Sequence, residues 1–100
     1  AFDYATYAAT QGPRLETPAE INKMDKEGCH IVGMTGMPEA ALAREADLCY
    51  ASIAVVANMA AGRGEGEITM DEINQNLDSG MNKVRAILTG VIPLIQLVAV

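Results

Sequence analysis

The sequence predicts an α/β fold whose sheet is at least partly parallel, on three observations. Short apolar runs rich in β-branched residues alternate with helix-favouring segments along the 100 residues. The apolar runs are continuous, which is typical of strands covered on both faces. The helix-favouring segments begin with recognisable capping signals. Together these features give the order β-α-β-α-β-loop-α, and a chain of this length allows one modest domain.

The predicted strands occupy residues 4–10, 30–34 and 50–57. Three short strands make a thin sheet, and parallel strands need cover on both faces. We therefore expect residues 1–100 to be a single but partial domain, completed by more of the same polypeptide or by another subunit.

The first predicted helix has the clearest start. Thr17 and Glu20 form a T-x-x-E capping box, and Pro18 stands at the first helical position. Gly28 is a suitable residue to end the helix. A second helix is expected from Pro38 through residue 46, where strong helix formers are dense.

The third and longest helix is expected over residues 69–92. It starts with another T-x-x-E motif at 69–72, and Pro93 should end or kink it. Its apolar residues recur at spacings of three and four, as on one face of a helix: Met70, Ile73, Leu77, Met81, Val84 and Leu88. The glycine-bearing segment 60–67 before it is expected to be a flexible loop.

Composition and charge exclude several functions. Seven basic residues against thirteen acidic ones, with a net charge of −6, provide no cationic stripe for a nucleic acid. The longest apolar runs fall far short of the ~20 residues that span a membrane. No signal peptide is visible in the sequence given. Cys29, His30 and Cys49 lack the spacing of a metal site, so we expect no metal, reduced thiols and a cytoplasmic location.

Chemistry-bearing residues follow each predicted strand, and the carboxyl ends of strands are where ligands gather in open α/β sheets. Glu16 follows the first strand, Thr35 the second and Asn58 the third. A helix start preceded by Gly and Thr can bind an anion. Each residue also has an ordinary explanation: Thr35 as a helix cap, Glu16 as a solvated loop acid and Asn58 as a turn residue.

Four strings in order carry a specific resemblance: TQGPRLET, VGMTGMPEAALARE, CYASIAVVAN and the AAG of the loop. From about residue 7 to residue 88 the chain resembles the C-terminal part of the purine nucleoside phosphorylase and methylthioadenosine phosphorylase family. It is most similar to the bacterial branch that acts on S-methyl-5′-thioinosine. The resemblance implies a three-layer α/β/α fold with a mixed, largely parallel central sheet.

For the purine, the resemblance assigns Glu16 to N1–H of the base and Asn58 to O6 and N7. Adenosine-type members carry other residues at both positions, so a 6-oxopurine is implied. Mispaired buried polar groups cost about 1–3 kcal/mol, which supports that discrimination. Gly33 would let the base approach the backbone. Leu15 replaces the Phe common at its position, so aromatic stacking is lost or comes from elsewhere.

For the sugar and the phosphate, the resemblance places Met34 against the ribose and Thr35 on phosphate. Met70, with Ile73 one turn further, matches the position that selects the 5′ group. Nucleoside-preferring members have His there and methylthio-preferring members an apolar side chain. The alternative for Met70 and Ile73 is ordinary core packing.

The implied reaction is phosphorolysis of an N-glycosidic bond by a pentosyltransferase of purine salvage, with Asn58 stabilising the leaving base. Phosphate is a co-substrate and no cofactor is needed. Family members are commonly trimers, so a homo-oligomer is expected. Arg14 is the only basic residue near the expected site, and a structural salt bridge is its alternative role.

The chain also departs from the family, because the longer N-terminal portion that carries most phosphate-binding residues is absent from these 100 residues. We therefore expect little or no catalysis by this chain alone, and the hypothesis is that the chain is a fragment of a full-length phosphorylase. The alternatives are a non-catalytic fragment or nucleoside-binding remnant, and an inosine or guanosine phosphorylase or related nucleosidase.

Overall fold

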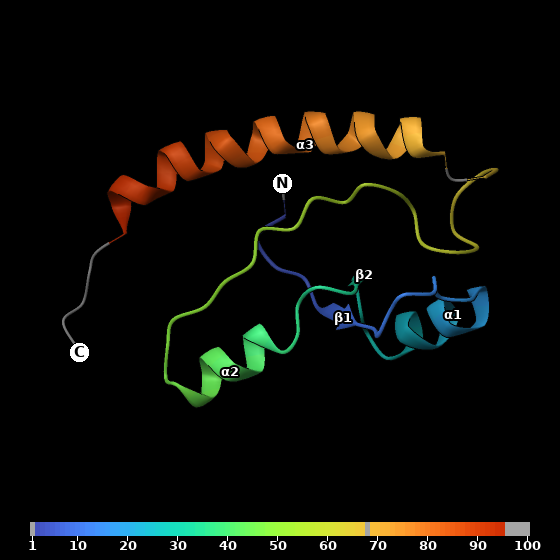
Figure 1. The fold of residues 1–100 in the computed structure, drawn as a ribbon, viewed down its shortest axis with the longest axis horizontal. Helices are drawn as coiled ribbons and strands as arrows, with labels where there is room; N and C mark the ends of the chain where they lie inside the picture. The colour runs from blue at the N-terminus through green and yellow to red at the C-terminus, as the bar shows by residue number, and fades with distance from the viewer. Residues whose placement is uncertain (1, 68, 96–100) are drawn as a thin grey trace. The chain divides into compact units, whose positions relative to one another are not determined.

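A computed structural model describes residues 2–67 and 69–95. Its elements, in order, are β1 (Tyr7–Ala9), α1 (Pro18–Lys26), β2 (Ile31–Gly33), α2 (Glu39–Glu45), α3 (Met70–Val91) and a 3₁₀ turn (Ile92–Leu94) (Figure 1). The described residues form two compact units. One contains residues 2–52 and 59–67, and the other contains residues 53–58 and 69–95.

The sheet of the first unit has two parallel strands, β1 and β2, which lie side by side in Figure 1. Tyr7 is in register with Ile31 and Ala9 with Gly33. The pairing extends past the strand ends, because the Thr10 amide donates to the Gly33 carbonyl at 2.8 Å. The predicted runs 4–10 and 30–34 thus contain the observed strands, which are shorter.

Both helices of the first unit confirm the local signals in the sequence. The Thr17 hydroxyl accepts from the Glu20 amide at 3.2 Å, and the Glu20 carboxylate accepts from the Thr17 amide at 3.0 Å. This reciprocal capping box, with Pro18 at the first turn, satisfies amides that have no partner inside the helix. The second helix, α2, ends one residue before the predicted residue 46.

Residues 60–67 belong to the first unit and contact α1. The Arg63 guanidinium lies 2.7 Å from an Asp25 carboxylate oxygen and 3.0 Å from the Asn22 side-chain oxygen. A Cβ added at Gly62, whose φ is +77°, would stand 3.0 Å from the Pro18 Cβ. The flexibility expected of this segment stays a prediction, and these contacts attach its first half to the helix.

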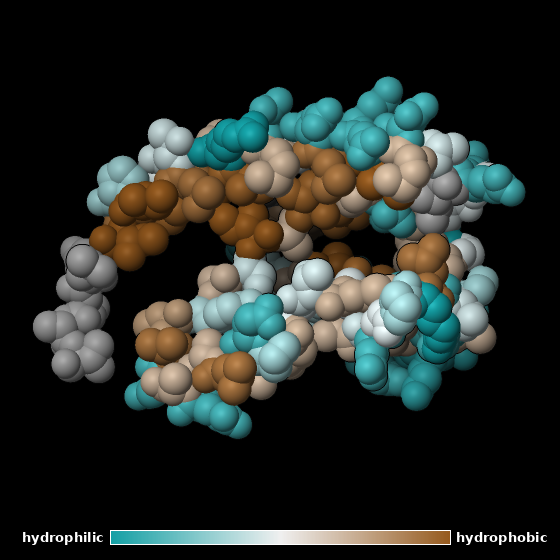
Figure 2. Space-filling view, in the orientation of Figure 1, coloured by the Kyte–Doolittle hydropathy of each residue, from teal (hydrophilic) through white to brown (hydrophobic). Residues whose placement is uncertain are grey.

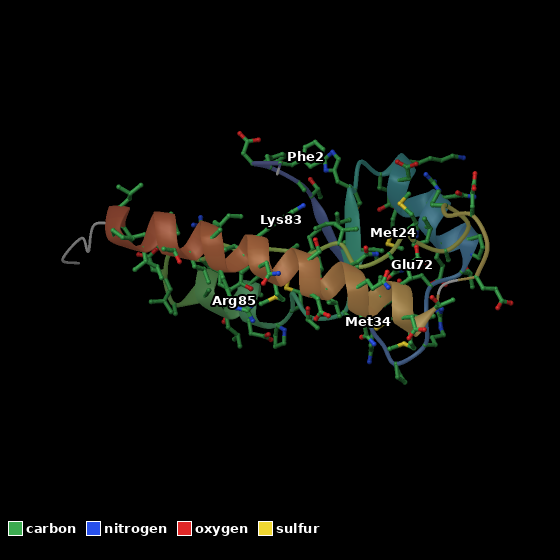
Figure 3. The ribbon with its side chains drawn as sticks, turned by 90° about the horizontal axis from the view of Figure 1, so that it is seen from above. Phe2, Met24, Met34, Glu72, Lys83 and Arg85 are labelled. Atoms are coloured by element: carbon green, nitrogen blue, oxygen red, sulfur yellow. The ribbon has the colours of Figure 1, made fainter. Side chains whose placement is uncertain are left out.

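In the second unit, residues 53–58 lie beside α3. The Asn76 side chain donates to the Ala57 carbonyl at 2.6 Å, and Val55 occupies the space beside Gly80. Along α3, apolar side chains gather on one side of the helix and polar ones on the other (Figure 2). Lys83 and Arg85 project from opposite sides of α3 in Figure 3, as residues two positions apart on a helix do.

The third predicted strand, 50–57, is wrong, because these residues are not assigned to a strand. A strand is defined by its ladder of hydrogen bonds, and the sheet in the described part of the chain contains only β1 and β2. The apolar composition of 50–57 is real, but no described neighbour pairs with it. The helices and the small parallel sheet are consistent with the α/β class.

Few side chains of the described residues are buried. The buried apolar residues among them are Ile21 and Ala43, 6% and 9% exposed, and both lie in the first unit. None of the helices in the described ranges has the length and apolar character needed to cross a membrane.

Candidate functional site

The carboxyl ends of β1 and β2 bring together the loops that follow these strands. Thr10 directly follows β1 and bonds to Gly33, the last residue of β2. Residues 11–17 and residues 34–38 therefore leave the sheet at the same edge. This edge is where open parallel sheets place their ligand sites.

Glu16 lies half-buried in the first of these loops, near the hydroxyl of Thr10. That hydroxyl is 3.5 Å from a Glu16 carboxylate oxygen and 3.4 Å from the Gly33 carbonyl. The hydroxyl thus has two acceptors near its single proton. Leu15, by contrast, is 75% exposed.

Thr35 lies in the loop after β2, beside the phenol of Tyr7. The Thr35 amide donates to the Tyr7 hydroxyl oxygen at 3.2 Å, and the two hydroxyl oxygens are 3.5 Å apart. The N-cap position of α2 is Pro38, and no side chain caps it. Helix capping, the ordinary explanation for Thr35, is therefore not what this hydroxyl does here.

Met34 connects the two loops through its sulfur. A Cβ added at Gly12 would stand 2.8 Å from that sulfur, so a larger residue at this position would require the thioether to shift. Met34 is half-buried and is labelled in Figure 3. The contact holds the glycine that begins the GPRLET motif against the residue that follows β2.

Arg14 forms the structural ion pair that the sequence left open. Its two terminal nitrogens lie 2.8 and 3.1 Å from the two carboxylate oxygens of Glu20. Hydrogen bonds from Arg14 and from Thr17 lower the pKa of Glu20 to about 2. The hydrogen bond to Glu20 in turn raises the pKa of Arg14. The pair is solvent-exposed, and it fixes the loop that carries Glu16 to the start of α1.

The remaining predicted site residues belong to the second unit. Asn58 is the last residue of the segment beside α3, and the Asn76 bond to Ala57 holds the position just before it. Met70 begins α3 and is 66% exposed, while Ile73 is half-buried one turn later. The eight predicted residues thus divide into five in the first unit and three in the second: Leu15, Glu16, Gly33, Met34 and Thr35, and Asn58, Met70 and Ile73.

Cys29, His30 and Cys49 do not form a metal site. His30 accepts a hydrogen bond from the Thr6 amide at 2.8 Å through Nδ1, and its ring meets the Tyr4 ring edge-on. Within residues 2–67 and 69–95, no three His, Cys, Asp or Glu side chains cluster closely enough to hold a metal ion. His30 instead provides a hydrogen-bond acceptor for the backbone amide of Thr6.

Sequence analysis missed three residues of this arrangement: Tyr7, Thr10 and Asn76. Tyr7 lies inside a strand, where an aromatic residue signals only β propensity. Thr10 is a polar residue at a strand's carboxyl end, a signal that could have been used. Asn76 lies on a helix in which the sequence signal, the spacing of apolar residues, says nothing about the polar positions. All three act through contacts with residues distant in sequence.

The model of one protein family, described as the phosphorylase superfamily, matches residues 2–93. A protein of Pseudomonas syringae pv. tomato, named "Probable S-methyl-5'-thioinosine phosphorylase", is 60% identical over 90 residues, which are 90% of this chain and 37% of that protein. A protein of Dictyoglomus turgidum, named "Probable 6-oxopurine nucleoside phosphorylase", is 44% identical over 95 residues, 95% of this chain and 36% of that protein.

A relative with the first of these names in Methanothermobacter thermautotrophicus is 46% identical over 90 residues, 90% of this chain and 32% of that protein. The chain spans about a third of the length of the curated relatives it matches. Because the family model covers nearly all of the chain, these 100 residues belong to the phosphorylase superfamily.

Proposed function

We propose that this chain supplies the base-recognising part of a purine nucleoside phosphorylase, with S-methyl-5′-thioinosine as the preferred nucleoside. One observation carries the proposal. In a chain of the phosphorylase superfamily, the carboxylate of Glu16 and the hydroxyl of Thr35 follow paired parallel strands and leave the sheet at one edge. A base-binding acid and an anion-binding hydroxyl at one sheet edge suit a nucleoside and a phosphate.

The base specificity follows from donor and acceptor chemistry. An ionised carboxylate only accepts hydrogen bonds, and the N1–H of hypoxanthine donates one, whereas N1 of adenine is an acceptor. Glu16 therefore favours a 6-oxopurine. Asn58 offers both a donor and an acceptor, so its amide can donate to O6 or N7 of the base. A mismatch at either position costs about 1–3 kcal/mol.

The 5′ group is selected at Met70 in this proposal. Its side chain is unbranched, polarisable and exposed at the start of α3, which suits contact with a methylthio group. The names of the relatives from Pseudomonas syringae and Methanothermobacter thermautotrophicus support the same nucleoside. Ile73 would extend this apolar surface by one turn.

The proposed reaction exchanges one bond for another at the sugar. An oxygen of inorganic phosphate attacks C1′ and forms a C–O bond while the C1′–N9 bond breaks, and both electrons of that bond leave with the purine. Asn58 donates to the leaving base, where negative charge develops in the transition state. The purine takes up the proton that the attacking hydrogen phosphate gives up, directly or through water, so the products are hypoxanthine and 5-methylthioribose 1-phosphate. Phosphate is a co-substrate, and the proposal requires no metal or organic cofactor.

Further phosphate ligands would come from outside these 100 residues. Arg14, the nearest cation in the sequence, is engaged by Glu20. The curated relatives are about three times as long as the region they share with this chain. In this proposal, β1 and β2 belong to a larger, largely parallel sheet of a three-layer domain. Activity is therefore to be tested on the protein as isolated from cells.

The test is an assay of free base released from S-methyl-5′-thioinosine, inosine and S-methyl-5′-thioadenosine, with and without phosphate, on protein of measured mass. We expect the fastest release from S-methyl-5′-thioinosine and release only when phosphate is present. Release that does not depend on phosphate would identify a nucleosidase. Faster turnover of S-methyl-5′-thioadenosine would contradict the role given to Glu16.

A second candidate is a phosphorylase of inosine or guanosine. The name of the Dictyoglomus turgidum relative, a probable 6-oxopurine nucleoside phosphorylase, favours it. One apolar contact discriminates by only about 1–3 kcal/mol, so the two candidates share the base pocket and differ at Met70. Met70→His separates them: if Met70 selects the methylthio group, this change should raise kcat/KM for inosine relative to S-methyl-5′-thioinosine.

A further inference from the structure

The phenol of Tyr7 lies in the bend of the loop after β2. Its oxygen accepts a hydrogen bond from the Thr35 amide at 3.2 Å and stands 3.5 Å from the Thr35 hydroxyl oxygen. Tyr7 itself is half-buried and belongs to β1, so the contact joins the first strand to the loop that follows the second. Tyr7 and Thr35 are separated by 28 positions in the sequence.

Two glycines leave the space that this phenol occupies. A Cβ at Gly33 would collide with the Tyr7 hydroxyl, and a Cβ at Gly36 would stand 3.2 Å from a ring carbon. Neither glycine has the left-handed backbone conformation that would by itself require glycine. Packing of the Tyr7 ring therefore explains both, and it offers Gly33 a role besides the close approach of a purine.

The donors and acceptors at the contact between Tyr7 and Thr35 restrict how its hydrogen bonds can be arranged. An amide N–H can only donate, so the phenol oxygen accepts from Thr35 and keeps its own proton. Either of the two hydroxyls can be the donor at this 3.5 Å contact, and the phenol proton can therefore point at the Thr35 hydroxyl oxygen. When Thr35 accepts in this way, its own hydroxyl proton is left to donate elsewhere.

Phosphate dianions need donors, because their oxygens accept hydrogen bonds, and a hydrogen bond to an ionised group is stronger than one between neutral groups. We propose that Tyr7 is a positioning residue that fixes the Thr35 amide and turns the Thr35 hydroxyl into a donor toward phosphate. This inference rests on the proposed function, in which Thr35 binds the attacking phosphate. Tyr7 acts through Thr35 and has no contact with the substrate in this proposal.

The test compares Tyr7→Phe with the wild type in the protein as isolated from cells. The substitution keeps the ring between the two glycines and removes only the hydroxyl. We expect KM for phosphate to rise about three- to tenfold, the effect of losing one or two hydrogen bonds, while KM for the nucleoside and the melting temperature change little. Tyr4→Phe is the matched control, because Tyr4 contacts His30 through its ring and should leave both KM values unchanged.

A second pair of variants shows whether Tyr7 works through the hydroxyl of Thr35. In a Thr35→Ala background that hydroxyl is absent and only the bond to the backbone amide remains, so adding Tyr7→Phe should raise KM for phosphate by less than it does with Thr35 present. An undiminished effect in that background overturns the inference. Equal rises in both KM values with a lower melting temperature also overturn it, because they would show a purely structural role.

The outcome for the wild type separates this inference from the proposed function. If the wild type releases base only with phosphate and Tyr7→Phe matches it in both KM values, the proposed function stands and the role of Tyr7 is wrong. If the wild type releases base without regard to phosphate, the proposed function fails and the inference fails with it.

Discussion

Hydrogen bonds between segments far apart in the sequence tie the first unit together, whereas the second unit consists of one long helix with an extended segment beside it. In the first unit, Thr10 bonds to Gly33, Thr35 to Tyr7 and Arg63 to Asp25. In the second, the Asn76 side chain donates to the Ala57 carbonyl. The described residues that are buried, Ile21 and Ala43, also lie in the first unit.

This contrast teaches where the chain can position side chains by itself. Hydrogen bonds and paired strands fix Glu16, Met34 and Thr35 relative to one another within the first unit. Asn58 and Met70 lie on elements with mostly exposed surfaces. An amphipathic helix gains most of its stability from packing its apolar face against other residues. Burying the apolar side chains that are exposed on α3 would therefore stabilise this helix further.

The largest expected effect comes from truncating Ile21, the larger of the two buried side chains of the first unit. Ile21→Ala should lower the free energy of unfolding by about 2–4 kcal/mol, because it removes buried methyl groups and leaves a cavity. Ile87→Ala, on α3 and 42% exposed, is the matched change in the second unit and should cost less than about 1 kcal/mol. Urea denaturation of both variants measures the difference, and equal losses would contradict the contrast between the units.

Glu16→Gln tests the polar arrangement of the first unit through activity. The variant should lose about 10- to 100-fold in kcat/KM for S-methyl-5′-thioinosine, because an amide replaces the charged acceptor for N1–H. Glu45→Gln, an exposed change on α2, serves as the control and should leave kcat/KM unaltered. A Glu16→Gln enzyme with wild-type kinetics would show that this carboxylate does not bind the base.

Two glycines of α3 sharpen the comparison within the second unit. Gly80→Ala should destabilise by about 1 kcal/mol net, because its Cβ meets Val55 and overpacking outweighs the better helix propensity of alanine. Gly90→Ala has open space around its Cβ and should stabilise by up to about 1 kcal/mol. Opposite shifts in melting temperature would confirm that residues 53–58 pack on α3, whereas two stabilising changes would exclude it.

The smallest effect concerns the exposed ion pair at the start of α1. The pKa of Glu20 is lowered from 4.5 to about 2 in the folded protein, so ionised Glu20 favours folding above pH 4.5. That contribution is lost as the pH falls from 4.5 towards 2. Urea midpoints of the wild type and Glu20→Gln should therefore differ at pH 6 and converge near pH 2. A constant difference across this range would mean that the pair does not contribute.

The parts of the fold that depend on neighbouring residues were predictable from the sequence. The capping box of Thr17 and Glu20 needs only residues three apart, and it was predicted at its observed position. The strand expected at 50–57 was wrong because pairing depends on a distant partner, and apolar composition does not reveal whether that partner is present.

The candidate site shows the same division between local and distant effects. That Glu16 and Thr35 leave one sheet edge follows from the rule for parallel strands and was expected. The ion pair of Arg14 was one of two interpretations, and the structure was needed to choose between them. The contact of Tyr7 with Thr35 could not be predicted, because nothing in the local pattern says which way a strand tyrosine reaches.

The tight fit of Tyr7 between two glycines has a consequence for how this segment can change during evolution. A side chain at position 33 needs volume that the phenol now fills, and one at position 36 needs the ring to shift slightly. Substitution at these positions is therefore coupled. Related proteins that carry a larger residue at either glycine position should carry a smaller one in place of Tyr7. Substitution of one glycine by a larger residue, with Tyr7 retained, should be selected against.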